Sequence, residues 1–170
     1  LAVVGAGMVA VPINPTTPAF AVKEELEAVQ AKALIAGPAA RLLVGSNPEG
    51  ALDAVEHVVS CGFDQDGGPT FEQLADTEPA DWTDVEGDTP AVYAFTSGTA
   101  GFPKPAILSH ANLLVNLQQA AASADNRQRA DDVALGVAPL SHIMGLNLVL
   151  GAALHSGASV VLIERFDPVL

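Results

Sequence analysis

The sequence predicts an α/β protein in which a mostly parallel sheet has helices on both faces. Two observations predict this class. Short apolar runs that suit buried strands, such as residues 33–36, 91–95 and 159–163, alternate with amphipathic segments that suit helices. The alternation recurs along the chain in the order strand, helix, strand, which is the order that builds a parallel sheet.

Caps and apolar spacing predict the elements of the first sixty residues. A helix should end at Gly5 or Gly7, and a strand should follow over residues 8–13. Thr17 is expected to cap a helix that starts at Pro18 and runs to about residue 30, because threonine is a good N-cap and proline suits the first helical position. Strands are predicted over residues 33–36 and 55–60, with a short helix over residues 38–44 between them.

Residues 62–88 are rich in acids and contain a Gly-Gly-Pro run, which predicts a solvated connector. One helical turn is expected within it at residues 71–74, and Trp82 is expected to anchor it locally against the body of the protein. The chain is therefore expected to divide into an α/β unit over residues 1–61, the connector over residues 62–89 and a second α/β unit over residues 90–170.

The second α/β unit is predicted to contain two capped helices. Ser109 should cap a helix over residues 110–125, and Ser141 should cap an apolar helix over residues 142–155 that ends at Gly157. Strands are predicted over residues 132–137 and 159–163, so that strands and helices alternate here as well.

Composition narrows the classes of partner. The 170 residues are 49% apolar, which is ample for a hydrophobic core, and the formal net charge of −13 argues against nucleic-acid or anionic-membrane partners. Any anion that the protein binds must therefore be held by local contacts.

Cys61 is the single cysteine, which excludes an intramolecular disulfide and favours a reducing compartment, so a cytoplasmic location is expected. No apolar run reaches the roughly 20 residues that a transmembrane helix needs.

The run from Tyr93 to Lys104, Y-A-F-T-S-G-T-A-G-F-P-K, is predicted to form a phosphate-binding loop between two strands. Its hydroxyls alternate with two glycines that let backbone N–H groups approach an anion, and Lys104 supplies a mobile positive charge. A second strand is expected over residues 105–108, so the loop differs from the P-loop that opens a helix. The predicted phosphate-binding residues are Thr96, Ser97, Gly98, Thr99, Ala100, Gly101 and Lys104, and Lys104 is the predicted catalytic residue. Composition alone also fits an ordinary surface turn.

His142 and Gly145 are the second candidate site, in the run P-L-S-H-I-M-G. They lie where a predicted strand gives way to a helix, and ligands bind at that end of parallel sheets. A histidine at a helix start can also be simply exposed. No metal site is predicted, because the histidines are isolated in sequence and the acids lie mainly in the connector. A Ser-His-Asp triad is disfavoured because the chain has no G-x-S-x-G elbow.

Five segments in family order resemble the adenylate-forming superfamily, and in particular its acyl-CoA synthetases. They are A-G-M-V-A-V-P-I-N-P near the start, T-S-G-T-A-G-F-P-K, S-H-A-N, P-L-S-H-I-M-G and R-F-D-P. Three positions depart from the usual pattern. Ala100 stands where the family has a hydroxyl residue, Pro105 where it has glycine, and Ser141 where it has an aromatic residue.

The resemblance implies an enzyme that uses ATP and Mg²⁺ to convert a carboxylic acid, such as a fatty acid, to an acyl-adenylate and then transfers the acyl group to coenzyme A. It implies that Lys104 and the loop hydroxyls neutralise charge on the phosphates as pyrophosphate leaves. It also implies that His142 and Gly145 lie beside the acyl pocket. The principal acidic Mg²⁺ ligand and the C-terminal domain of the family have no counterpart in these 170 residues.

The expected identity is therefore the N-terminal part of an adenylation domain over residues 1–170, catalytically inactive by itself. We expect self-association through apolar faces, because mean hydropathy is +0.34. Two other interpretations use the same loop or the same fold: a stand-alone nucleotide- or anion-binding module, and an inert truncated fragment.

Overall fold

The computed structural model describes residues 1–65, 67–96, 104–123 and 128–163. The strands described there pair two by two. The pairs are β1 (Ala33–Ala36) with β2 (His57–Ser60), β3 (Pro90–Thr96) with β4 (Lys104–Ser109), and β5 (Val133–Gly136) with β6 (Ser159–Leu162). The first and last pairs are parallel, which confirms the predicted α/β class, although the described strands form three pairs where one sheet was expected.

Contacts divide the chain into two compact units. Unit 1 contains residues 1–14, 82–94 and 107–170, and unit 2 contains residues 15–81 and 95–106. Because each unit is assembled from segments that are separated in the sequence, the boundaries cannot be read as consecutive stretches of chain.

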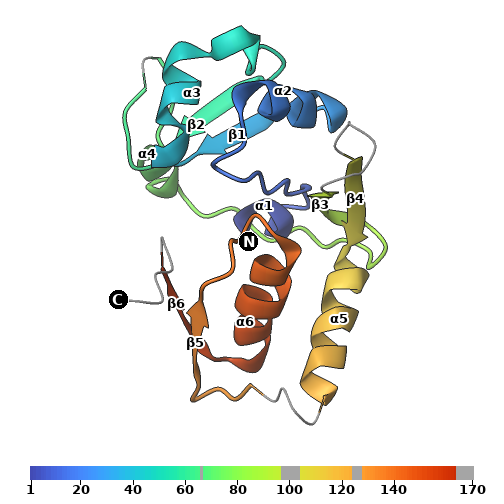
Figure 1. The fold of residues 1–170 in the computed structure, drawn as a ribbon. Helices are drawn as coiled ribbons and strands as arrows, with labels where there is room; N and C mark the ends of the chain where they lie inside the picture. Colours follow the sequence, from blue (N-terminus) through green and yellow to red (C-terminus); the bar gives the residue numbers. More distant parts are fainter. Residues whose placement is uncertain (66, 97–103, 124–127, 164–170) are drawn as a thin grey trace, which may run out of the picture. The chain divides into compact units, whose positions relative to one another are not determined.

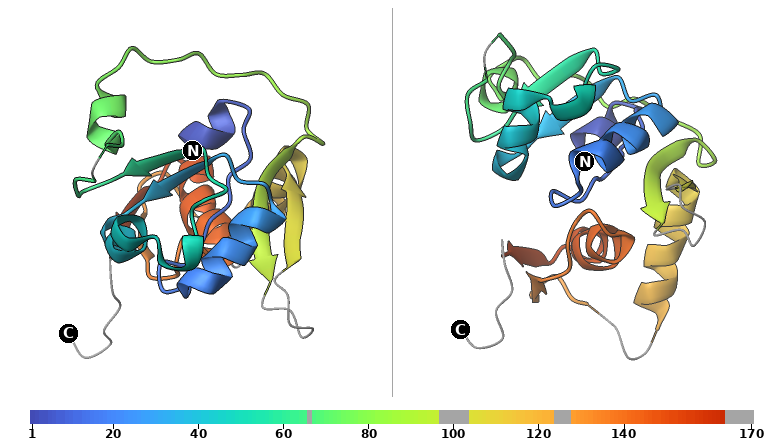
Figure 2. Two further views of the ribbon diagram at one scale, coloured as in Figure 1. Left: turned by 90° about the horizontal axis from the view of Figure 1, so that it is seen from above. Right: turned by 45° about the horizontal axis from the view of Figure 1, so that its top comes forward.

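Unit 2 is built around the parallel pair β1–β2, whose strands run side by side in Figure 2. Its helices are α2 (Ala19–Ala28), α3 (Arg41–Ser46) and α4 (Phe71–Ala75), with short 3₁₀ turns η1 (Pro38–Ala40) and η2 (Pro48–Gly50). Val22 and Leu26 are four residues apart, so they share one face of α2, and both are buried. This face and the buried residues Ala36 and Val59 of the strands supply much of the core of unit 2.

Unit 1 contains α1 (Ala2–Gly5), α5 (His110–Ala122), the π-helix η3 (Met144–Gly151) and α6 (Ala152–Ser156). The continuous segment of η3 and α6 lies between α5 and the β5–β6 pair (Figure 1). The core of unit 1 includes Ala91 and Val92 of β3 and Ala153 of α6, all of which are buried. None of the helices that the structure describes is long and apolar enough to span a bilayer.

Several predicted elements are confirmed with their caps. Ser109 caps α5 through a capping box in which its hydroxyl accepts from Asn112 N and Asn112 Oδ1 accepts from Ser109 N. Gly157 ends α6 with φ 77°, a left-handed conformation that glycine adopts without strain. The strand over 33–36 has its predicted bounds, and the helical turn at 71–74 is part of α4.

The predicted strand over residues 8–13 was wrong. Only Ala10 pairs there, through a parallel bridge to Val92 in which Ala10 N donates to Ala91 O at 2.9 Å. Pro12 has no N–H to offer a continuing ladder, which limits the pairing to one residue. Trp82 lies against Gly5, as a local anchor would, but its side chain remains 76% exposed.

Two predicted helix starts were also wrong. Pro18, in extended conformation at ψ 150°, occupies the cap position in place of Thr17, and the helix begins at Ala19. No side chain caps η3 at its cap residue Ile143, so Ser141 does not have the predicted role. Helix ends were overestimated too, since α2 stops at Ala28, two residues before its predicted end.

Candidate functional site

The predicted phosphate loop connects two strands that pair as a hairpin. Thr96 is the last residue of β3 and Lys104 the first of β4, and Thr96 Oγ1 donates to Lys104 O at 3.2 Å. A connection of seven residues is too short for a parallel crossover, so the strands run antiparallel. The strands predicted on the two sides of the loop are confirmed. Ser97, Gly98, Thr99, Ala100 and Gly101 lie outside the described residues.

Lys104 is exposed at the point where the loop enters β4. The ion pair found among the described residues joins Lys32 to Glu56, so no described carboxylate neutralises the Lys104 ammonium. An unpaired lysine beside a Gly- and hydroxyl-rich loop can interact with an anionic ligand without first breaking an ion pair.

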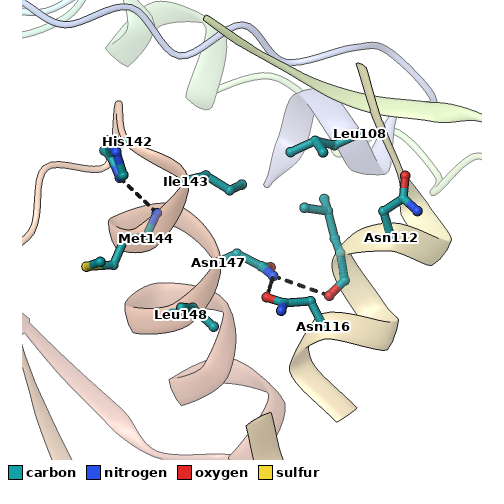
Figure 3. A pocket seen from close by; sticks show the side chains of 9 residues that line it. Leu108, Asn112, Asn116, His142, Ile143, Met144, Asn147 and Leu148 are labelled. Carbon is teal, nitrogen blue, oxygen red and sulfur yellow. Dashed lines mark hydrogen bonds between the residues drawn. The ribbon is translucent and has the colours of Figure 1, made fainter. Parts of the chain in front are cut away.

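A cavity of about 350 Å³ lies within unit 1, between the N-terminal half of α5 and the start of η3 (Figure 3). Its walls are mainly apolar, with four polar side chains set among them. The lining residues are Leu108, Asn112, Leu113, Asn116, His142, Ile143, Met144, Asn147 and Leu148. The volume lies at the lower end of the range usual for small-molecule sites.

The turn before η3 holds His142 at the rim of this cavity. His142 N donates to Pro139 O at 3.0 Å, and the ring atom Nδ1 accepts from Met144 N at 3.2 Å (Figure 3). The imidazole therefore accepts a hydrogen bond from the backbone N–H of Met144 at the helix start. This is the capping role that was predicted for the Ser141 hydroxyl. Gly145 is buried directly behind this turn, where an added Cβ would lie 2.2 Å from Pro139 O. Gly145 thus supports the turn from behind and does not line the cavity.

Two asparagines of the cavity wall, Asn116 and Asn147, are not among the predicted site residues, and Asn112 was noted only as part of the S-H-A-N segment. Asn147 is 6% exposed, and its Nδ2 donates to Asn116 Oδ1 at 2.9 Å and to Leu113 O at 3.3 Å, which ties η3 to α5 (Figure 3). One signal was available: Asn147 is a polar residue in the middle of the apolar run 143–154, and a buried amide needs partners. Its partners on α5 lie 31 and 34 residues away, which no local pattern reveals.

The described carboxyls with displaced pKa values all belong to unit 2. Hydrogen bonding to Lys32 lowers the pKa of Glu56, and backbone N–H groups of Glu72 itself and of Gly62 lower the pKa of Glu72. Burial raises the pKa of Glu25. None of these carboxyls lines the cavity. In the part of the chain that the structure describes, no three His, Cys, Asp or Glu side chains gather as metal ligands would.

Comparison with known proteins gives one consistent family. The family model for AMP-binding enzymes matches residues 1–170. A 4-coumarate:CoA ligase of Petunia hybrida is 30% identical over 166 residues, which cover 95% of this chain and 30% of that protein.

Two solved structures from Rhodopseudomonas palustris share the fold. One, assigned as a long-chain-fatty-acid CoA ligase, has a TM-score of 0.83 at 27% identity and covers 98% of this chain and 41% of its own. The other is MatB with ATP bound, with a TM-score of 0.78 at 26% identity, and it covers 98% of this chain and 32% of its own. The chain therefore spans well under half the length of these relatives.

Proposed function

The chain belongs to the AMP-binding enzyme family, and on that premise we propose that it carries the phosphate-binding part of an ATP-dependent enzyme that activates a carboxylic acid. In the proposed reaction a carboxylate oxygen attacks the α-phosphorus of ATP, the bond from that phosphorus to the oxygen bridging the β-phosphate breaks, and pyrophosphate leaves. The acyl group then passes to the sulfur of coenzyme A, and AMP leaves. We propose a fatty acid as the substrate, which agrees with the mainly apolar cavity.

One observation carries the proposal: Lys104 is exposed and without a described ion-pair partner, at one end of a loop rich in glycine and hydroxyls. We propose that its ammonium attracts the β- and γ-phosphates and stabilises the negative charge that grows on pyrophosphate as it leaves. The bond from Thr96 Oγ1 to Lys104 O supports this role, because it ties the two ends of the loop together.

We propose His142 and Gly145 as residues of the acyl side of the site, His142 at the cavity rim and Gly145 as its support. ATP and coenzyme A are the proposed co-substrates. The described residues do not supply a ligand set for the Mg²⁺ that accompanies ATP, so we assign no step to that ion. The single cysteine agrees with a cytoplasmic location for the enzyme.

The proposal is tested by calorimetric titration of Mg-ATP into the 170-residue chain and into Lys104→Ala. A charge-assisted hydrogen bond is worth about 1.5–3 kcal/mol, so removal of the ammonium should weaken binding about tenfold to a hundredfold. Lys23→Ala is the matched control, because it removes the same charge from a lysine whose Nζ donates to Glu49 O at 3.1 Å. The control should change the dissociation constant less than about twofold.

Ala100 and Pro105, the two residues that differ from the family pattern in and beside the loop, are tested by the same titration. If the parent chain binds no ATP, the double variant Ala100→Thr, Pro105→Gly restores the family hydroxyl and the family glycine. Binding by the double variant would show that these two residues disabled the loop. Failure of both proteins to bind would overturn the proposed phosphate site.

A stand-alone nucleotide-binding module would show the same dependence on Lys104. Pyrophosphate release from ATP in the presence of a fatty acid separates the two functions. We propose that these 170 residues bind ATP without completing the reaction, since they cover 30% of the Petunia ligase. Pyrophosphate release by this chain alone would contradict that part of the proposal.

A further inference from the structure

The hydrogen bonds of the cavity determine which atom of Asn116 is left for a ligand. Leu113 O can only accept, so the Asn147 atom 3.3 Å away must be the amide nitrogen Nδ2. The second hydrogen of that nitrogen points to Asn116 at 2.9 Å, so the Asn116 atom that receives it is the carbonyl oxygen Oδ1. The Asn116 amide nitrogen, a donor, has no hydrogen-bond partner among the described residues and is free for a ligand, and Oδ1 keeps one of its two lone pairs.

The other polar groups of the cavity wall are left with donors too. Asn112 Oδ1 accepts from Ser109 N at 3.1 Å, and the Asn112 amide nitrogen has no hydrogen-bond partner among the described residues. Because His142 Nδ1 accepts from Met144 N, the ring nitrogen that remains to donate is Nε2. Asn147 Oδ1 lies beside Gly151, which does not line the cavity.

The two amide donors carry no charge, and no lysine or arginine among the described residues lines the cavity. Asn112, Asn116 and His142 are exposed, so a ligand atom at these donors stays in contact with water. A carboxylate there would gain most from a charged partner, whereas a carbonyl or ether oxygen needs only an N–H donor. The free amide donors therefore suit a neutral acceptor oxygen at the open edge of the apolar cavity. Asn116 differs from the other two in that its oxygen is bound from the opposite wall of the cavity, by the buried Asn147 of η3.

We propose that Asn116 is a specificity-determining residue that selects carboxylic acids carrying an acceptor oxygen within the acyl chain, such as oxo acids, over acids with a plain hydrocarbon chain. This inference rests on the proposed function, because it assumes that the cavity receives the acyl chain. Asn147 acts through Asn116 and is a positioning residue.

The test compares the binding of decanoic acid with that of ten-carbon acids that carry one chain carbonyl at successive positions, measured by titration of the 170-residue chain. At least one oxo acid should bind about five- to tenfold more tightly than decanoic acid, the effect of one or two neutral hydrogen bonds. The ratio of the two dissociation constants is the quantity to follow, because it cancels effects on overall affinity.

Asn116→Asp is the informative variant. It keeps an oxygen to accept from Asn147 Nδ2 and replaces the free amide nitrogen with an acceptor of the same size, so the ratio should fall to about one or below. Gln118→Glu makes the same change of charge on the exposed surface of α5 and does not line the cavity, so its ratio should stay at the parent value. Asn116→Leu removes the donor without adding charge and should also abolish the preference. Far-UV circular dichroism confirms that each variant is folded.

Equal affinity of the parent chain for all the acids, no binding of any acid, or an unchanged ratio in Asn116→Asp would each overturn the inference. The ATP titration distinguishes this failure from failure of the proposed function. A chain that binds ATP through Lys104 without an oxo-acid preference refutes only the role of Asn116. An oxo-acid preference in a chain that binds no ATP, even as the Ala100→Thr, Pro105→Gly variant, refutes only the proposed phosphate site.

Discussion

Replacement of Gly145 by alanine should destabilise the protein, because the first turn of η3 lies directly against the backbone that precedes it. An added Cβ would lie 2.2 Å from Pro139 O and 2.6 Å from Ala138 O. Non-bonded heavy atoms normally stay about 3.5 Å apart or more, so these contacts must open by about 1 Å. Backbone carbonyls cannot rotate away as the end of a side chain can, and the turn itself must move.

The magnitude follows from two effects. Overpacking of a buried site costs about 1–3 kcal/mol. Pro139 O also accepts from His142 N at 3.0 Å, and loss of that hydrogen bond adds about 0.5–1.5 kcal/mol. We therefore expect the free energy of unfolding to fall by about 2–4 kcal/mol in Gly145→Ala, a large part of the stability of a domain of this size.

Urea unfolding followed by far-UV circular dichroism measures the change. Gly87→Ala is the matched control in the same unit, because its added Cβ would meet only Ala111 Cβ, at an ordinary 3.5 Å. The control should stay within about 0.5 kcal/mol of the parent. If Gly145→Ala unfolds at the same urea concentration as Gly87→Ala, the close packing behind His142 is refuted.

Three further predictions concern other parts of the chain. Ser109→Ala should cost about 1 kcal/mol in urea unfolding through loss of the capping box of α5, and an unchanged midpoint would contradict it. N–H donors of Glu72 and Gly62 hold the Glu72 pKa below its ordinary value. The ionised carboxylate therefore stabilises the fold at any pH above the pKa that Glu72 has in the unfolded chain. This contribution is lost as the pH falls through the Glu72 pKa of the folded protein. Stability of the parent should therefore drop more than that of Glu72→Gln between about pH 5 and pH 3, and parallel curves would exclude the effect. Leu135 and Val161 are paired, half-exposed residues on one face of β5–β6 and should promote self-association. Leu135→Lys should therefore lower the molecular mass measured by light scattering. A parent protein that stays a monodisperse monomer at high concentration would argue against self-association.

Local signals in the sequence predicted most elements because their causes are local. The cap of α5 depends on Ser109 and Asn112, three residues apart, and the end of α6 depends on the conformational freedom of Gly157. The strands on either side of the phosphate loop follow from apolar runs that the loop residues interrupt. The two helix starts that were predicted wrongly involve local competition. Pro18 displaced Thr17 at a cap, and the His142 ring took the N–H expected for Ser141.

By itself, the sequence determined the α/β class, the order of elements, the phosphate-loop candidate and the family, because each depends on residues close together in the chain or on motifs in fixed order. The cavity was decided only by the tertiary structure. It forms where η3 packs on α5, and the orientation of the Asn116 amide is determined by Asn147, which reaches Asn116 and Leu113 across more than thirty residues of chain. An amide has both a donor and an acceptor, and which of them faces a ligand depends on which is used elsewhere in the fold.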